Sequence, residues 1–203
     1  MVSDSIESIA REDLTTLVSN QILIVDNVLD SDFCQELIVK FLAEHNHRKV
    51  NIASDHGIIS FDELNVMQTE GWKKERNVLL DYLDYASDLY KKSMKVPDYA
   101  WPKQPQYEQI RMKHYRPNLY DRFDPHVDVG NHDTARRFLV MFWYLNDVLV
   151  GGETEFYFHN LKVTVKPKTG RLICFPPMWT HPHAGLKPVS NEKFIVGGYL
   201  HYT

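Results

Sequence analysis

The sequence predicts an α+β fold in which a β-sandwich or β-barrel is buttressed by helices on one side. Apolar residues at helical spacing occupy the first half of the 203-residue chain, and short alternating or wholly apolar segments typical of strands follow them. The length suits one domain with its own core, and no repeat or low-complexity segment is visible. We therefore expect a single domain over residues 1–203, helical over about 1–100 and strand-rich over about 105–203.

The N-terminal half is expected to form one strand followed by two helices. The first twenty residues are polar and are expected to be loosely held. The apolar run Ile22–Val25 then predicts a strand. Candidate N-caps from Asp30 onward precede one helical stripe of apolar residues, namely Cys34, Leu37, Ile38, Phe41 and Leu42. A second helix is predicted from about Trp72 to Met94, and residues 51–71 are interpreted as strand plus loop.

The C-terminal half changes to strand periodicity. Residues 107–115 and 161–165 alternate between apolar and polar side chains, as half-exposed strands do. Phe138–Leu145 is apolar on both faces and predicts a central strand covered on both sides. The remaining predicted segments are a turn at 168–170, a strand at 171–175 and a last strand that opens at Phe194.

The composition excludes several classes of protein. Lysine and arginine number 23 against 27 aspartate and glutamate, and the net charge of −4 argues against nucleic acid or an anionic membrane as partner. No apolar stretch reaches the roughly 18 residues of a membrane span, and the acidic N-terminus lacks a signal-peptide pattern. Cys34 and Cys174 provide neither a disulfide framework nor a thiolate zinc site. We therefore expect a cytoplasmic protein with both thiols free.

Ten histidines are the unusual feature of the composition, and several of them lie in the second half. Residues i and i+2 of a strand face the same side, so His126 and Asp128 can converge on one point. A third ligand is then required, and His181, His183 and His201 are all candidates. Two histidines and one carboxylate form the arrangement that holds Fe(II) while leaving coordination positions open.

A basic residue downstream strengthens this interpretation. Lys193 lies ten residues beyond His183, at the start of the predicted last strand. A 2-oxo acid that chelates iron leaves its distal carboxylate some way from the metal. A lysine ammonium can neutralise that carboxylate inside a barrel, where an unpaired charge is costly.

At this point the chain resembles a known family, the 2-oxoglutarate- and Fe(II)-dependent dioxygenases, particularly their prolyl 4-hydroxylase-like branch. Four ordered segments carry the resemblance: HYRPNLYDRFDPHVD (114–128), RFLVMFWYLNDVLVGGETEF (137–156), VKPKTGRLICFPP (165–177) and HAGLKPVSNEKFIVGGYL (183–200). The resemblance implies a double-stranded β-helix (jelly-roll) core with N-terminal buttressing helices. The chain shows no peptide-binding domain ahead of this part, unlike the animal prolyl hydroxylases, and the substrate therefore stays open.

The resemblance also implies roles for individual residues. His126, Asp128 and His183 correspond to the iron ligands and form the implied catalytic group. Lys193 corresponds to the residue that binds the C5 carboxylate of 2-oxoglutarate. Tyr115 corresponds to a tyrosine that reaches the same carboxylate, with a plain core tyrosine as the alternative. The implied cofactors are Fe(II), 2-oxoglutarate as cosubstrate and O2, with ascorbate as a candidate reductant.

The spacing to Lys193 decides between the neighbouring histidines. His183 keeps the separation that is found in prolyl hydroxylases, whereas His181 would stretch it to twelve residues. We therefore take His183 as the ligand and leave His181 as a group near the ligand or the substrate. Further expectations are that Thr154 does not contact the cosubstrate, that Trp179 forms a pocket wall and that Arg136-Arg137 is solvated surface.

Three functions from different classes remain. The resemblance favours a hydroxylase of a prolyl or other residue in a protein or peptide, with release of succinate and CO2. A hydroxylase of a free amino acid, another small metabolite or a nucleobase would use the same core, and a basic strip (Arg111, Lys113, Arg116) could serve a nucleobase. A cupin-like binding module or isomerase would keep the barrel without iron chemistry. Loops at Asn51–Gln68 and Asn118–Pro125 are expected to rim the pocket and to distinguish a polypeptide from a small-molecule substrate.

Overall fold

The structure is a computed structural model that describes residues 16–54 and 57–203. Over these residues one antiparallel sheet and two α-helices account for the fold. The strands are β1 (Thr16–Ser19), β2 (Ile22–Val25), β3 (Arg48–Ser54), β4 (Gly57–Asn65), β5 (Gln106–Tyr107), β6 (Arg111–Tyr115), β7 (Arg122–His126), β8 (Arg137–Tyr144), β9 (Thr154–Phe158), β10 (Leu161–Val165), β11 (Leu172–Phe175), β12 (His183–Gly185) and β13 (Lys193–His201). The helices are α2 (Ser31–Ala43), α3 (Lys73–Ser93) and the 3-10 helix η1 (Asp98–Ala100).

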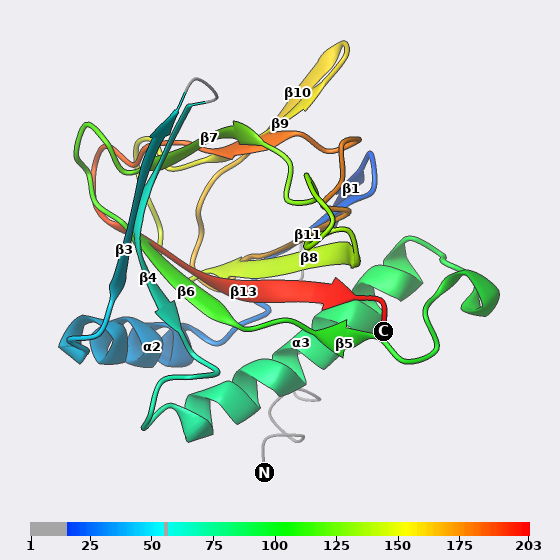
Figure 1. Ribbon diagram of the computed structural model, residues 1–203, viewed down its shortest axis with the longest axis horizontal. Coiled ribbons are helices and arrows are strands. Elements are labelled where there is room, and N and C mark those ends of the chain that lie inside the picture. Colours follow the sequence, from blue (N-terminus) through cyan, green and yellow to red (C-terminus); the bar gives the residue numbers. More distant parts are fainter. Residues whose placement is uncertain (1–15, 55–56) are drawn as a thin grey trace.

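The sheet curls until its two ends face each other (Figure 1). Its order is β1-β2-β11-β8-β13-β6-β4-β7-β12-β9-β10, with β3 paired to β4 and β5 paired to β13. The bend lies at β4, because Asp62–Asn65 pair with β6 while Ile59 and Ser60 pair with β7. The result is the predicted α+β jelly roll, with β2, β11, β8, β13 and β6 in one layer and β7, β12 and β9 in the other.

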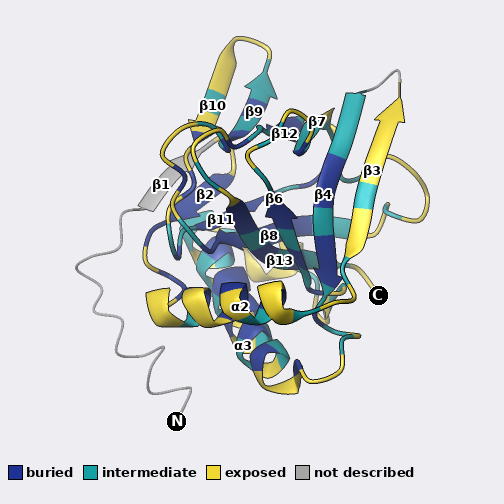
Figure 2. Cartoon of the chain, turned by 90° about the vertical axis from the view of Figure 1, so that its left-hand side faces the viewer, coloured by how far each residue is buried: buried dark blue, intermediate teal, exposed yellow. Residues whose placement is uncertain are grey.

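Both faces of the larger layer are buried, as the sequence predicts for Phe138–Leu145. Along β8, Leu139, Met141 and Trp143 point outward into the cluster that packs against α2 and α3. Val140 and Tyr144 point inward into a second cluster between the two layers. Because side chains alternate along a strand, a strand covered on both sides has to be apolar throughout. The burial pattern is visible in Figure 2, where the central strands are dark.

Helix α2 begins and packs as its sequence predicts. The Asp30 carboxylate accepts hydrogen bonds from the backbone N–H groups of Asp32 and Phe33, which caps the first turn. Cys34, Leu37, Ile38 and Phe41 are buried against the sheet. Leu42 is the exception in the predicted stripe, since it is 54% exposed.

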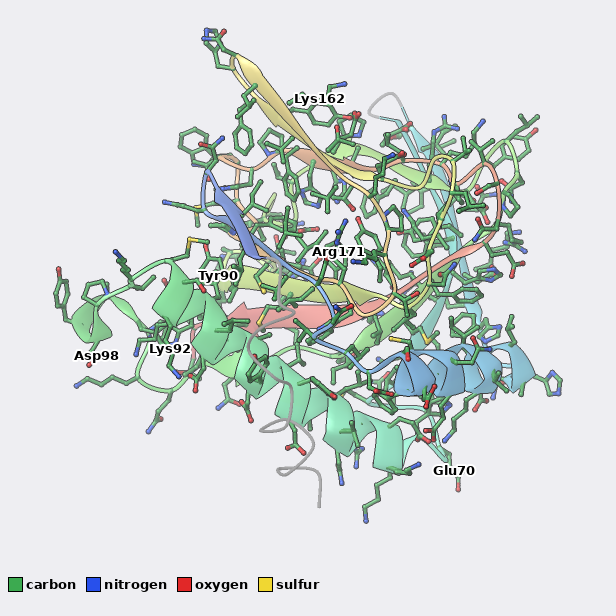
Figure 3. All side chains as sticks on the ribbon, turned by 180° about the vertical axis from the view of Figure 1, so that it is seen from behind. Glu70, Tyr90, Lys92, Asp98, Lys162 and Arg171 are labelled. Atoms are coloured by element: carbon green, nitrogen blue, oxygen red, sulfur yellow. The ribbon has the colours of Figure 1, made fainter. Side chains whose placement is uncertain are left out.

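Helix α3 matches the predicted second helix within one residue at each end. All five residues predicted on its buried face are buried, namely Leu79, Tyr82, Leu83, Ala86 and Tyr90. The Tyr90 hydroxyl also donates to the backbone carbonyl of Gln21, which ties the helix to the turn before β2 (Figure 3). Within the described chain, no helix combines the length and the apolar character needed to cross a membrane.

Two expectations about the N-terminal half require correction. The segment interpreted as strand plus loop contains two paired strands, because all of β3 pairs with residues 57–63 of β4, from Arg48–Glu63 to Ser54–Gly57. Within the segment expected to be loosely held, residues 16–19 form β1 and pair with β2, whereas residues 1–15 lie outside the described residues. In both cases strand pairing with a neighbour, which the sequence does not display, fixes the backbone.

Candidate metal and cosubstrate site

A pocket of about 730 Å³, including the open space at its mouth, lies between the two layers of the sheet. One wall comes from the inward side chains of β6, β8 and β13, and the other from β7, β9 and β12. All five residues predicted to form the site line it, namely Tyr115, His126, Asp128, His183 and Lys193.

The three predicted metal ligands lie together at this pocket. One ligand atom each from His126, Asp128 and His183 lies within 4.8 Å of the other two. His126 is the last residue of β7, and His183 begins β12, which pairs with β7 so that the two histidines face each other in register. Asp128 lies just past β7, where its backbone N–H donates to the carbonyl of Pro177. The sequence predicts Asp128 within a strand, whereas in the structure it lies just beyond the end of β7. Its carboxylate still lies close to His126, as predicted.

Backbone carbonyls orient both imidazole rings. His126 Nδ1 donates to the carbonyl of Asp124 at 2.9 Å, and His183 Nδ1 donates to the carbonyl of His181 at 3.1 Å. The Nε2 atom of each ring is therefore free of its proton and points toward Asp128, with Nε2–carboxylate distances of 3.5 Å in both cases. A carbonyl acceptor on the far nitrogen is the usual partner of a metal-ligating histidine.

The electrostatics suit a cation. Burial lowers the pKa of His183 to about 4, so its imidazole is neutral at physiological pH and available as a ligand. Burial by itself would raise the pKa of Asp128, but His183 and His126 beside it lower that pKa, and the carboxylate stays ionised. Two imidazole nitrogens and one carboxylate oxygen on one side of a cavity fit Fe(II) with positions left open.

The competing histidines are engaged elsewhere. His181 Nε2 donates to the carbonyl of Asn20 at 2.8 Å, and its Nδ1 lies 2.9 Å from the hydroxyl of Thr180. His201 is at the end of β13 and hydrogen-bonds to the carbonyl of Tyr202. Among the described residues, the only group of three such ligands is the one with His183.

Lys193 and Tyr115 form the closed end of the pocket. They are cross-strand partners of β13 and β6, and Lys193 Nζ lies 4.4 Å from the centre of the Tyr115 ring. Lys193 is only 2% exposed, and Nζ donates to the carbonyl of Gly152 at 3.0 Å. Burial lowers its pKa to about 7. An anionic group at this end of the pocket would restore the favoured charged form.

Comparison with known proteins agrees with this geometry. Residues 111–201, which include His126, Asp128, His183 and Lys193, match the sequence model of the 2OG-Fe(II) oxygenase superfamily. A curated protein of Acanthamoeba polyphaga mimivirus that carries the name of a prolyl 4-hydroxylase is 33% identical over 104 residues. That match covers 43% of this chain and 42% of the relative, so the chain spans less than half of the length of that relative.

Solved structures of 2OG-Fe(II) oxygenases share the fold. The viral collagen prolyl hydroxylase of Paramecium bursaria Chlorella virus-1, in its 2-oxoglutarate complex, gives a TM-score of 0.65 at 20% identity and covers 91% of this chain and 98% of its own. The prolyl hydroxylase of Trichoplax adhaerens, in complex with a peptide of hypoxia-inducible factor, gives 0.70 at 17% identity and covers 90% and 84%. The jelly roll and its buttressing helices are therefore a fold that these two prolyl hydroxylases share with this chain.

Several residues that line the pocket or support its ligands were not identified from the sequence. Thr154, at the start of β9, lines the pocket and accepts a hydrogen bond of 2.6 Å from the buried hydroxyl of Tyr144. The expectation that Thr154 does not contact the cosubstrate stays a prediction, but its side chain lies at the pocket. The sequence does contain a signal for this position. Gly151 and Gly152, whose φ angles are 76° and 79°, form a turn, and Thr154 follows that turn at the start of an inward-facing strand.

Arg137 is a second correction, since it was expected at the surface. Its guanidinium forms two hydrogen bonds with the Glu108 carboxylate and a third with the backbone carbonyl of Asp128. It also stacks 4.1 Å from the ring centre of Tyr199, whose hydroxyl donates to Asp128 Oδ1 at 2.9 Å. Arg137 and Tyr199 thus orient Asp128, the predicted metal ligand. Contacts between residues so far apart in the sequence leave no local sequence pattern.

Two predicted elements of the pocket rim are placed differently. Trp179 is 78% exposed and is absent from the pocket lining. From the predicted rim segments, only Phe123 lines the pocket, where its ring stacks on His126 with 3.4 Å between ring centres. The hairpin β3–β4 instead packs beside β7, where Ile58 N–H donates to the Asp124 carboxylate at 2.7 Å.

The predicted basic strip is divided between the inside and the outside. Arg111 and Lys113 line the pocket, whereas Arg116 binds Asp62 and Asp121 away from it. Alternation along β6 explains the inward position of Lys113, because it lies two residues from Tyr115. A lysine on the inner face of a barrel was not anticipated from the sequence.

Proposed function

We propose that the protein is a 2-oxoglutarate-dependent Fe(II) dioxygenase that hydroxylates a prolyl residue of a peptide or protein. The observation that carries the proposal is the convergence of His126, Asp128 and His183 on one side of a pocket that Lys193 closes on the other. A pocket with a metal-ligand group and a separate ammonium group suits a cosubstrate that binds a metal at one end and carries a carboxylate at the other. Superfamily membership of residues 111–201 supports the same chemistry.

Each group of the chain has a defined part in this function. His126, Asp128 and His183 hold the metal, and Lys193 neutralises the C5 carboxylate of 2-oxoglutarate, with Tyr115 against it. Bound Fe(II), with 2-oxoglutarate and O2, supplies the oxidising power that hydroxylates a C–H bond and releases succinate and CO2. The aromatic rings that pack on the ligand histidines exclude water and fix their orientation, namely Phe123, Phe156 and Phe175.

The choice of a peptidyl substrate rests on the relatives. The Trichoplax structure contains a peptide fragment, and the viral structure is described as a collagen prolyl hydroxylase. A free amino acid or other small metabolite is the second candidate, because the site chemistry is common to both. We further propose ascorbate as reductant, one domain over the whole chain and a cytoplasmic location, the last supported by two buried free cysteines.

The first test is an anaerobic titration of the Fe(II)-loaded protein with 2-oxoglutarate. We expect the weak visible charge-transfer band that arises when a 2-oxo acid chelates Fe(II). Substitution of Lys193 by Met should weaken 2-oxoglutarate binding at unchanged iron content, because the hydrogen-bonded charge is lost. Absence of the band in iron-loaded protein would contradict the proposal and would leave the likeness as one of fold alone.

Single alanine substitutions test the three ligands. His126→Ala, Asp128→Ala and His183→Ala should each lose stoichiometric Fe(II) binding, measured by metal analysis after gel filtration. His181→Ala is the matched control and should retain its iron, because both ring nitrogens are engaged outside the group. Iron binding that survives His183→Ala but not His181→Ala would reverse the assignment.

A further inference from the structure

Lys113 places a second lysine inside the pocket, where the proposed chemistry requires only Lys193. On β6 it lies opposite Ile195 of β13 and opposite Glu63 of β4. It is thus the inward position on β6 next to Tyr115, which lies opposite Lys193.

The surroundings of Lys113 are aromatic. Its Nζ lies 4.8 Å from the ring centre of Phe61 and 5.6 Å from that of Phe123, the residue that stacks on His126. Within residues 16–54 and 57–203, no carboxylate lies within 4.0 Å of its ammonium and no hydrogen-bond acceptor is assigned to it. Contacts with ring faces stabilise a lysine only partly when it is withdrawn from water.

The other charged groups around the pocket are already paired. Arg111 donates to the Glu63 carboxylate at 2.6 Å, so the carboxylate that faces Lys113 across the strands is bound to another cation. Arg137 is held by both oxygens of Glu108. Lys113 and Lys193 are the two lysines that line the pocket.

Lys193 and Lys113 have different partners when the charges of the metal, its ligand Asp128 and 2-oxoglutarate are added up. The C5 carboxylate of a bound 2-oxoglutarate is matched by Lys193. Its C1 carboxylate is matched by the single positive charge that Fe(II) and Asp128 carry together. Lys113 then remains as a partly buried cation. The two carboxylates whose charges act on it, Asp128 and Glu63, are already matched by the metal and by Arg111, and an ammonium group withdrawn from water without its own anion is costly.

We propose that Lys113 binds a carboxylate of the primary substrate, so that the enzyme selects an anionic substrate. The inference rests on the proposed function and names the substrate class for the same site. Two sources supply this chemistry, the α-carboxylate of a free amino acid and the acidic side chain of a residue beside the target proline. Substrates without the carboxylate are disfavoured because they leave the buried charge unpaired.

Binding measurements on a non-reacting complex test this proposal. The protein is loaded with Zn(II) and saturated with 2-oxoglutarate, and ligand binding is measured by calorimetry. The probes are two matched pairs: L-proline with L-prolinamide, and acetyl-Glu-Pro-Glu-amide with acetyl-Gln-Pro-Gln-amide. We expect the member of at least one pair that carries the carboxylate to bind about 10- to 100-fold more tightly than its amide partner. The pair that shows the preference identifies the source of the carboxylate.

Substitutions assign the preference to Lys113. Lys113→Met keeps the length of the side chain and should reduce the preference to less than about threefold, whereas Lys113→Arg should keep most of it. Lys92→Met is the control, because Lys92 is exposed near the end of α3 (Figure 3) and should bind the probes as the wild type does. Thermal unfolding of each variant establishes that it is folded, and removal of a buried charge is not expected to destabilise Lys113→Met.

Three results would overturn the inference. They are a lack of preference for the member that carries the carboxylate in both pairs, a preference that persists in Lys113→Met, and a loss of 2-oxoglutarate affinity of more than about tenfold in Lys113→Met. The last result would assign Lys113 to the cosubstrate. Failure of the proposed function is recognised separately, because the Fe(II) charge-transfer band with 2-oxoglutarate would then be absent from the wild type as well.

Discussion

The two histidines of the proposed metal site are fixed in one tautomer by the backbone. His126 and His183 each donate Nδ1–H to a carbonyl two residues earlier in the chain. The geometry therefore depends on the local backbone of β7 and β12 rather than on other side chains. It presents two Nε2 lone pairs to the same point before any metal binds, which lowers the cost of ordering the ligands.

Tyr199 is predicted to tune the affinity of the metal site. Its hydroxyl donates to Asp128 Oδ1, which leaves Oδ2 on the side of His183. Tyr199→Phe should lower Fe(II) affinity by about tenfold without unfolding the protein, because the carboxylate loses an orienting partner. Competition with a metal chelator measures the change.

Tyr99→Phe is the control, since Tyr99 is 92% exposed. An unchanged metal affinity in Tyr199→Phe would show that Arg137 and the backbone suffice to orient Asp128.

Lys193 gives a pH dependence to cosubstrate binding. Burial lowers its pKa to about 7 in the ligand-free protein, nearby Lys113 lowers it as well, and Glu153 opposes both. Below this pH the ammonium is already present, whereas above it binding of the dianion must take up a proton. The affinity for 2-oxoglutarate should therefore fall by up to about tenfold per pH unit above the pKa. Calorimetry in buffers of different ionisation enthalpy detects the proton uptake, and affinity that is flat across this range would contradict the assignment.

At the scale of elements, the alternation of side chains on β2, β8 and β11 joins the helical layer to the pocket. Ile22 and Ile24 face the inner cluster, whereas Leu23 and Val25 face α2 and α3. Burial of the outer set holds the helices, and burial of the inner set shapes the pocket floor. Each of these strands therefore contributes both to stability and to the pocket, because the same backbone positions its outward and its inward side chains.

The turn before β11 is predicted to be sensitive to any side chain. Gly170 has a φ of +72°, and an added Cβ would lie 2.2 Å from the carbonyl oxygen of Leu29. Its own carbonyl accepts from the N–H groups of Val28 and Leu29, which anchors the start of α2. Gly170→Ala should cost roughly 1–3 kcal/mol of unfolding free energy, measured by urea denaturation, because the residue is forced into a strained backbone conformation.

Gly130→Ala provides the matched comparison in this measurement. An added Cβ at Gly130 meets nothing within 4 Å, and its φ lies outside the left-handed region. A loss in Gly170→Ala no larger than that in Gly130→Ala would contradict the role of the turn.

For the whole molecule, the proposed ligands connect its two layers. His126 and His183 come from the smaller layer, while Lys193 and Tyr115 come from the larger one. Zn(II) with 2-oxoglutarate should therefore stabilise the protein against thermal unfolding, by about 2.7 kcal/mol at a ligand concentration 100 times Kd. His183→Ala should lose this stabilisation, and Lys193→Met should retain only the part due to the metal. Equal thermal shifts in wild type and both variants would contradict binding at this site.

The sequence predicts where helices and strands lie along the chain better than it predicts which of them pack or pair with one another. The strand Ile22–Val25 and the helix at Lys73–Ser93 follow from local apolar spacing, and both are confirmed. The segment of the β3–β4 hairpin is interpreted from sequence only as strand plus loop, because β3 is almost wholly exposed and gives little hydrophobic pattern. Leu42 belongs to the predicted stripe of α2 but lies beyond the edge of the sheet contact and is exposed.

The sequence by itself determined the helical and strand segments, because periodicity is a local property of the chain. Its family resemblance predicted the jelly roll and the site residues His126, Asp128, His183, Lys193 and Tyr115, and the structure brings these five residues to one pocket. The tertiary structure alone decided what surrounds them. It brought Tyr199 against Asp128 across more than seventy residues of sequence, and it turned Lys113 inward between Phe61 and Phe123. Contacts of this kind depend on which strands become neighbours when the sheet closes, and strand pairing is a property of the folded molecule.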